Sequence, residues 1–444
     1  MRREPPVSLS RRAMLGSLAA LPLAAMLGGC RSGTSKLSAR KPTLEVWAHA
    51  GQVGERRTLV RLADSFNAGR RRFAVHLTLL PEGAYNGQLQ AAALAGQLPD
   101  VFEFDGPYTA DYAWMGQLQP LDELLPATLR EDLLPSILSQ GTYNKRLYAV
   151  GQYDSGLGLF ARRDRLTAIG ASLPTSPGDA WTVEHFEDLL ARLAAATGNR
   201  PPLDLKLNYR GEWFTYGFAP ALWSAGGGLV SRDTRPPHAG GVLDGSKSTA
   251  AMRHIQRWTA AGRVDPNLDD AAFTTGRVAL SWVGHWEYPR YRQAVGRDLA
   301  LLPLPDFGEG ARTGEGSWTW GISAGCRHPE AAAEFLRYLL QTSNVLAMSG
   351  ANGAPPATRS AVARSPLYAQ DGPLRLYIEQ LAEGYALPRP RTPAYPAITS
   401  AFQQAFHAVR DGAKVPETLH RAATLIDRDI ADNKGYPNRE AVRG

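Results

Sequence analysis

Between residues 43 and 105, the spacing of hydrophobic positions alternates between that of a β-strand and that of an α-helix. Short apolar or alternating runs predict β-strands over 43–48, 73–79 and 100–105. Apolar residues at helical spacing predict helices over 55–67 and 85–96, between those strands. Strands that alternate with helices in this way are typical of a parallel sheet covered on both faces. We therefore predict an α/β fold.

Further segments repeat this mixture of elements. Residues 147–150 and 157–161 are strand-like, and Thr182 is a candidate N-cap for a helix with its apolar face within 186–193. A single hydrophobic core stops growing at about 250–300 residues, and this chain has 444. The sequence therefore predicts two α/β domains. Helical spacing predicts later helices over 248–262, 330–341, 399–410 and 416–431.

The first thirty residues have the pattern of a bacterial export signal. Four arginines within the first twelve residues precede an apolar run over 13–27. This run is shorter than the ~20 residues that span a bilayer as a helix. A basic start, a short apolar run and small residues before a cleavage point indicate a signal peptide over 1–30.

Two short motifs refine this prediction. Ser10-Arg11-Arg12-Ala13-Met14-Leu15 resembles the twin-arginine export motif, with Met14 where Phe is usual; an ordinary basic region is the alternative. Leu27-Gly28-Gly29-Cys30 resembles the lipobox, whose cysteine is joined to diacylglycerol and becomes the new N-terminus. We therefore predict lipidation at Cys30 and a polar tether over 31–42. The protein would be exported, periplasmic or at the cell surface, and anchored to a membrane.

Composition disfavours several other classes. Cys326 is the second of the two cysteines, so a lipidated Cys30 leaves no disulfide and no zinc site of the usual spacing. The formal net charge is +7, but residues 1–30 contribute +3 of it and the other basic residues are dispersed. We therefore expect no nucleic-acid partner, no metal and no cofactor.

Six short segments follow one another in an order that is known from one family. Together they resemble the extracellular solute-binding proteins of the maltose-binding-protein class, carbohydrate branch. One departure is Ala161-Arg162-Arg163-Asp164, which stands where the family usually has Tyr-Asn-Lys-Asp. The segments are Leu98–Phe102, Gly116–Asp122, Tyr148–Asp164, Phe273–Trp286, Gly316–Ile322 and Arg389–Tyr395.

The resemblance implies the type II periplasmic-binding-protein fold, in which two lobes close on a ligand by a hinge. Lobe one would comprise 43–153 plus 303–343, and lobe two 154–302 plus 344–444. The implied function is that of a monomeric substrate-binding component of an ABC importer. It would capture a mono- or oligosaccharide and deliver it to the membrane permease subunits. The alternative is a sensor subunit that presents its ligand to a receptor, and the sequence does not identify the sugar.

Sugars suit a particular set of side chains. They present apolar C–H faces ringed by hydroxyls, so aromatic rings cover the faces while carboxylates and arginine bond to the hydroxyls. Trp286 stands where the family places a stacking aromatic residue, and Trp318 and Trp320 face the same side of an extended segment. The predicted ligand-binding residues are Trp47, His49, Tyr85, Asp105, Tyr108, Tyr153, Asp154, Trp286, Trp318, Trp320, Arg389 and Tyr395.

Each of these residues also has a structural interpretation. An aromatic residue can belong to the core, Asp105 can cap the next helix, and Tyr153 and Asp154 can stabilise the hinge. Catalysis is disfavoured because His-Glu-x-x-His is absent and Ser155 lacks the glycine two residues earlier that a nucleophile elbow needs. We predict a binding protein and not an enzyme. A periplasmic glycosidase stays as an alternative, because the spacing of its paired carboxylates is spatial.

Replacement of Cys30 tests the anchor. Cys30→Ser should abolish incorporation of a labelled fatty acid, because serine cannot form the thioether, and should leave the signal peptide uncleaved by the lipoprotein peptidase. Metabolic labelling beside the unaltered protein measures both effects. Label that persists in the variant would contradict lipidation at Cys30.

Overall fold

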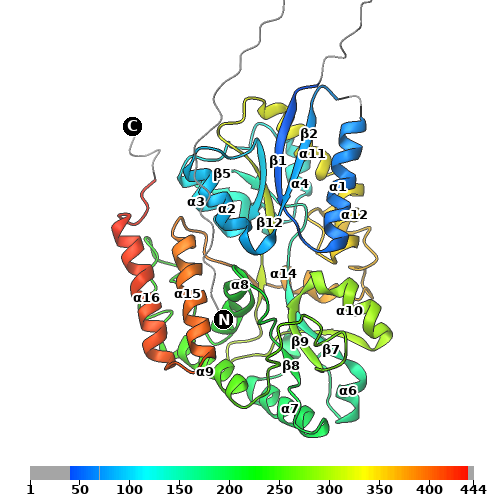
Figure 1. The fold of residues 1–444 in the computed structure, drawn as a ribbon, viewed down its shortest axis with the longest axis vertical. Helices are drawn as coiled ribbons and strands as arrows, with labels where there is room; N and C mark the ends of the chain where they lie inside the picture. Colours follow the sequence, from blue (N-terminus) through cyan, green and yellow to red (C-terminus); the bar gives the residue numbers. More distant parts are fainter. Residues whose placement is uncertain (1–40, 70, 439–444) are drawn as a thin grey trace, which may run out of the picture. The chain divides into compact units, whose positions relative to one another are not determined.

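Two separate β-sheets organise the part of the chain that the computed structural model describes, residues 41–69 and 71–438. Cys30, the arginine motif and residues 31–40 of the predicted tether lie outside these ranges. The described residues belong to one compact unit that contains both sheets (Figure 1).

The first sheet has five strands in the order β2-β1-β3-β12-β6. Strands β2, β1 and β3 run parallel, whereas β12 runs antiparallel to both β3 and β6. Helices α1 and α2 separate β1, β2 and β3 in the chain, so the predicted alternation over 43–105 is confirmed. The strands are β1 (Thr43–His49), β2 (Ala74–Leu80), β3 (Val101–Asp105), β6 (Ala149–Val150) and β12 (Trp318–Ile322).

The second sheet has four strands in the order β10-β7-β9-β8. Strand β7 runs antiparallel to β9 and β10, and β8 runs parallel to β9. Two short pairs complete the strands: β11 is parallel to β13, and β4 is antiparallel to β5. The bounds are β7 (Leu157–Arg162), β8 (Leu203–Asp204), β9 (Leu280–Gly284), β10 (Leu299–Leu302), β4 (Thr142–Tyr143), β5 (Arg146–Leu147), β11 (Thr313–Glu315) and β13 (Ala386–Pro388).

Helices cover these sheets (Figure 1). The α-helices are α1 (Val53–Ala68), α2 (Glu82–Leu94), α3 (Thr109–Trp114), α4 (Ala127–Asp132), α5 (Pro135–Gly141), α6 (Arg163–Ala168), α7 (Val183–Ala196), α8 (Trp213–Ser224), α9 (Ser246–Ala260), α10 (Tyr288–Val295), α11 (Pro329–Leu339), α12 (Thr342–Asn352), α13 (Arg359–Val362), α14 (Arg375–Ala382), α15 (Tyr395–Arg410) and α16 (Val415–Asp432). The 3₁₀ helices are η1 (Gly106–Tyr108), η2 (Pro177–Asp179), η3 (His285–Glu287) and η4 (Gly296–Asp298).

Each sheet has its own hydrophobic core. Strands β3 and β9 are buried along their whole length, as expected for strands covered on both faces. Helix α7 begins at the predicted cap, where Thr182 Oγ1 accepts a hydrogen bond from the His185 backbone N–H at 3.2 Å. The apolar face of α7, which includes Phe186 and Leu189, then packs into the second core.

Helix α12 contacts elements that adjoin both sheets. It packs against α1 and α11, and it also contacts α10 and η3. The predicted lobe boundaries therefore stay predictions.

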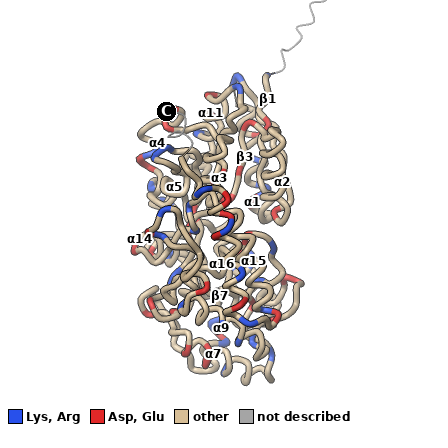
Figure 2. Tube along the Cα trace, turned by 90° about the vertical axis from the view of Figure 1, so that its left-hand side faces the viewer, with Lys and Arg blue, Asp and Glu red and all other residues tan. Residues whose placement is uncertain are grey.

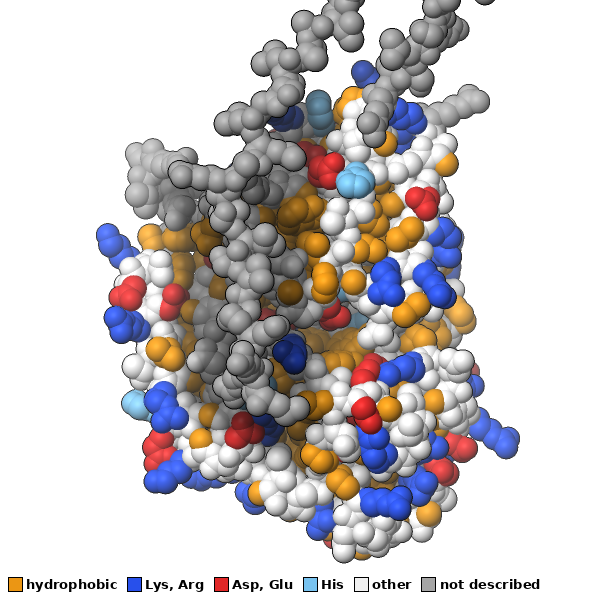
Figure 3. All heavy atoms as spheres, in the orientation of Figure 1, with side chains coloured by type: hydrophobic (Ala, Val, Ile, Leu, Met, Phe, Trp, Pro, Cys, Tyr) orange, Lys and Arg blue, Asp and Glu red, His pale blue; other side chains and the backbone are white. Residues whose placement is uncertain are grey.

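Positions of both charges are mixed on the faces shown. Lys and Arg positions are interspersed with Asp and Glu along the tube of Figure 2, and Figure 3 shows side chains of both charges on another face. Within residues 41–69 and 71–438, no helix is long and apolar enough to cross a membrane. Cys326 is a buried free thiol.

Candidate functional site

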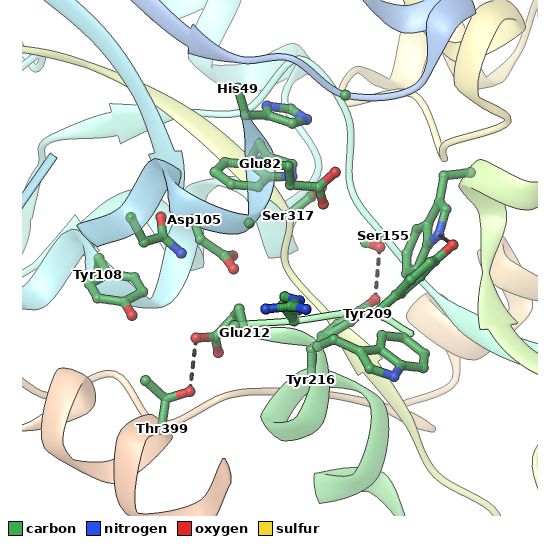
Figure 4. A pocket seen from close by; sticks show the side chains of 18 of the residues that line it. His49, Glu82, Asp105, Tyr108, Ser155, Tyr209, Glu212, Tyr216, Ser317 and Thr399 are labelled. Carbon is green, nitrogen blue, oxygen red and sulfur yellow. Dashed lines mark hydrogen bonds between the residues drawn. The ribbon is translucent and has the colours of Figure 1, made fainter. Parts of the chain in front are cut away.

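A cavity of about 550 Å³ is lined by residues at strand ends of the first sheet and by segments that adjoin strands of the second sheet (Figure 4). One wall lies at the carboxyl ends of β1 and β3, where ligands of α/β sheets usually bind. The opposite wall follows β9 and precedes α8. Lining residues that carry rings or charges are His49, Glu55, Glu82, Asp105, Tyr108, Tyr153, Tyr209, Arg210, Glu212, Trp213, Tyr216, His285, Trp286, Trp318 and Arg389.

Strand ends of the first sheet place an imidazole beside an indole. His49 is the last residue of β1 and Trp318 is the first of β12. The pairing of β12 with β3 sets Trp318 opposite Asp105. The rings of His49 and Trp318 stack with 3.9 Å between centroids and 9° between planes. The wall therefore combines a flat aromatic surface with charged groups.

Glu103 keeps His49 protonated. His49 Nδ1 lies 2.7 Å from the Glu103 carboxylate, and both side chains are buried. Burial lowers the pKa of His49, but the charge and hydrogen bond of Glu103 outweigh it, with help from Glu55 and Glu82, and raise the pKa to about 9. At neutral pH the cavity therefore contains a His49 cation that is already paired.

The opposite wall is aromatic. Trp286 follows β9 directly, and Tyr209, Trp213 and Tyr216 come from the segment that leads into α8 and from its first turn. The rings of Trp286 and Trp213 meet edge to face, with 6.0 Å between centroids. The wall offers ring surface to the apolar face of a ligand.

A buried charge cluster supports this wall from behind. Trp286 Nε1 donates to the Tyr209 hydroxyl at 3.1 Å, and that hydroxyl donates to Glu287 Oε1 at 2.7 Å. Glu287 lies 2.6 Å from Arg290 and 3.9 Å from the buried Lys206. The chain of bonds fixes the orientation of Tyr209 and Trp286 through groups that do not face the cavity.

The glycine of Gly284-x-Trp286 makes room for the tryptophan. A Cβ atom at Gly284 would overlap the six-membered ring of Trp286, which folds back over the end of β9. Tyr216 depends on Gly314 in the same way, because a Cβ there would meet the tyrosine ring at 2.6 Å. The spacing of the motif thus has a steric cause.

Arg389 joins carboxylates from different parts of the fold. Its guanidinium makes two hydrogen bonds to Asp105, at 2.7 and 3.0 Å, and one to Glu212 at 2.9 Å. It also lies over the Tyr216 ring, 4.7 Å from the centroid. Burial raises the pKa of Glu212 to about 8, although Arg389 acts to lower it. The cluster links the first sheet, the strand pair β11–β13 and α8.

Ser155 and His285 form a buried pair that faces the cavity. Ser155 Oγ lies 3.1 Å from His285 Nε2 and accepts a hydrogen bond from the Tyr216 hydroxyl at 2.8 Å. His285 Nδ1 faces the Asn352 carbonyl oxygen at 3.0 Å, and burial lowers the pKa of His285 to about 4. The backbone N–H groups of Ser155 and Gly316 are bonded to Asp154, so they offer no oxyanion site.

The chain also contains one Gly-x-Ser-x-Gly pattern, at Gly321–Gly325. Ser323 lies just after β12, is 3% exposed, and does not line the cavity. The pattern is followed by a turn and not by the helix that a nucleophile elbow requires.

The structure brings most of the predicted site residues together. The predicted residues that line the cavity are His49, Asp105, Tyr108, Tyr153, Trp286, Trp318 and Arg389. The remaining five do not line it, and their ligand role stays a prediction. They are Trp47, Tyr85, Asp154, Trp320 and Tyr395.

Each of these five has a structural role. Tyr85 is fully buried and donates its hydroxyl to the Glu103 carbonyl oxygen at 2.6 Å. Trp320 packs edge to face on a phenylalanine of α11, and Trp47 packs against the aromatic core beside β3. Asp154 accepts backbone hydrogen bonds, and Tyr395 packs on Tyr108 while its hydroxyl bonds to Glu212.

Several cavity residues were missed by the sequence prediction. Glu212 immediately precedes α8, and Glu82 is the first residue of α2. Neither residue lies in one of the six segments that resemble the family. Tyr209 and Tyr216 belong to a dense aromatic segment over 209–223, and that density was the available signal. Within the described ranges, no group of His, Cys, Asp and Glu side chains could hold a metal ion.

The fold has close counterparts among solved structures. The GacH receptor of Streptomyces glaucescens aligns with a TM-score of 0.74 and 22% identity, over 89% of this chain and 98% of that one. The MalE maltose/maltodextrin-binding domain of Bdellovibrio bacteriovorus aligns at 0.73 and 19%, over 88% and 100%. A solute-binding protein of Thermotoga lettingae aligns at 0.74 and 23%, over 87% and 99%. The predicted two-lobed, maltose-binding-protein-like fold is therefore confirmed.

Sequence comparison assigns the family. Residues 61–375 match the model of the bacterial extracellular solute-binding proteins. An uncharacterized lipoprotein in the oleD 5′ region of Streptomyces antibioticus is 26% identical over 355 residues, which is 75% of this chain and 74% of that one. The protein belongs to the bacterial extracellular solute-binding protein family.

The pairing of His49 with Glu103 predicts a measurable titration. In the unaltered protein, His49 should titrate near pH 9, as followed by NMR of the imidazole signals. In Glu103→Gln, burial lowers the pKa without the opposing charge of Glu103, so the pKa should fall toward or below the ordinary 6.5. A pKa that stays near 9 in the variant would contradict this assignment.

The steric fit of Trp286 on Gly284 predicts two linked losses of affinity. Trp286→Ala should weaken binding of the ligand about 30-fold, since a central aromatic anchor contributes about 2 kcal/mol or more. Gly284→Ala should weaken binding comparably by displacing the ring. Gly325→Ala is the matched control, because nothing lies within 4 Å of its Cβ position. Calorimetric titration decides, and a Gly284→Ala variant that binds normally would contradict the fit.

Proposed function

We propose that this protein captures a carbohydrate in the cavity and delivers it to the permease of an ABC importer, as a lipid-anchored monomer without enzymatic activity. The observation that carries the proposal is the composition of the cavity. Ring surfaces of Trp286, Tyr209 and Trp318 face a space that also contains the carboxylates of Asp105 and Glu212 and the guanidinium of Arg389. This pairing of rings with hydrogen-bonding groups, of which Asp105 and Arg389 form an ion pair, suits sugar faces and hydroxyls.

The relatives support the same class of ligand. The GacH receptor binds acarbose and an acarbose homolog, the MalE domain of Bdellovibrio bacteriovorus binds maltotriose, and the Thermotoga lettingae protein binds α-D-tagatose. The volume of about 550 Å³ lies within the usual range of small-molecule sites. The lipoprotein relative supports export and anchoring through Cys30.

A screen of the mature protein tests this proposal. Thermal unfolding is followed with mono-, di- and trisaccharides, polyols and glycerophosphodiesters, each beside Trp286→Ala. A sugar present at 100 times its dissociation constant should stabilise the protein by about 2.7 kcal/mol, and Trp286→Ala should reduce that shift. Stabilisation by no sugar, or an undiminished shift in the variant, would contradict the proposal.

Two further measurements separate the proposal from its alternatives. Chromatography after long incubation should recover the bound sugar intact, whereas repeated turnover would indicate a glycosidase. Cells that lack the protein should lose uptake of that sugar. Uptake that continues unchanged would contradict the importer role and favour a sensor.

A further inference from the structure

Two cations of the cavity, Arg389 and His49, already have carboxylate partners. Arg389 is bonded to both Asp105 and Glu212, and its pKa is raised by them although burial acts to lower it. His49 is bonded to Glu103 at 2.7 Å. The remaining cation of the lining, Arg210, belongs to the opposite wall, in the segment before α8, and is exposed to solvent as Glu82 is.

Two carboxylates on the wall formed by the first sheet, those of Glu82 and Glu55, have no hydrogen-bonded cation as a partner. Glu82 forms no hydrogen bond or ion pair with any side chain of the described residues, and Figure 4 shows it projecting into the cavity. Glu55 accepts hydrogen bonds from two neutral groups, the Tyr153 hydroxyl at 2.5 Å and the Asn352 amide at 3.2 Å. Its nearest cation is His49, at 3.8 Å.

These carboxylates crowd one another. Glu55 lies 3.8 Å and Glu103 2.7 Å from the His49 imidazole, and Glu82, which is exposed to solvent, lines the cavity beside His49 (Figure 4). One imidazolium therefore faces three neighbouring carboxylates, Glu55, Glu82 and Glu103. A cation that entered this part of the cavity would relieve the repulsion between like charges.

The facing wall also favours a cation. Tyr209 and Trp286 present aromatic rings, whose faces attract positive charge. A sugar with a protonated amine would place its apolar face on these rings and direct its N–H groups toward the carboxylates. Bonds between an ammonium group and a carboxylate are stronger than those between neutral partners.

We infer that the cavity selects a sugar that carries a protonated amine, which Glu82 and Glu55 receive. This inference rests on the proposed carbohydrate function and narrows its ligand class. A neutral sugar would use the same carboxylates only as acceptors for hydroxyl groups. The two cases differ in how strongly affinity depends on the amine.

Matched sugars test the inference directly. Calorimetric titrations compare glucose with glucosamine, galactose with galactosamine, and cellotriose with the chitosan trimer, and the N-acetylated counterparts control for size. At pH 6.5 an amino sugar should bind about tenfold or more tightly than its neutral counterpart. Glu82→Gln should remove most of that difference. The control variant is Glu123→Gln, which alters an exposed carboxylate outside the cavity and should retain it.

The outcomes separate this inference from the proposed function. Neutral sugars that bind as tightly as their amino counterparts would overturn the amine preference while leaving carbohydrate binding intact. An amine preference that survives in Glu82→Gln would overturn the role of Glu82. If no member of the panel binds, the inference is overturned, and the wider screen alone decides the proposed function. Thermal melts of both variants verify that each is folded.

Discussion

The site depends on the hydrogen bonds that the buried Arg389 guanidinium makes to two acidic side chains. Arg389 comes from the segment after β13 and bonds to Asp105 at the end of β3 and to Glu212 at the start of α8. Removal of one member of a buried ion cluster commonly costs about 3–5 kcal/mol, because the remaining charges lose their partner. The cluster therefore joins the two walls of the cavity in this structure.

The aromatic wall depends on a different constraint, the space that glycine leaves. Trp286 lies over Gly284, Tyr216 lies over Gly314, and Trp286 is hydrogen-bonded through Tyr209 to buried charges. Ring orientation is thereby set before a ligand arrives. Such preorganisation reduces the ordering cost of binding, so more of the contact energy contributes to affinity.

The sequence predicts more of the fold than of the site, for a physical reason. Periodicity reports which face of an element is buried, so the alternation over 43–105 and the Thr182 cap agree with the structure. Site residues come from the ends of elements that meet only in the folded chain. Trp318 and Trp320 share one face of β12, yet only Trp318 reaches the cavity, because α11 covers Trp320. Glu212 acquires its importance solely from contact with Arg389.

The most direct measurement is a crystal structure of the mature protein with the tightest sugar found by titration. The account predicts electron density for one sugar between Trp286 and the end of β3, with its hydroxyl or amine groups within hydrogen-bond distance of the Glu82, Asp105 or Glu212 carboxylates. A cavity that contains only solvent while the sugar occupies another surface would contradict it.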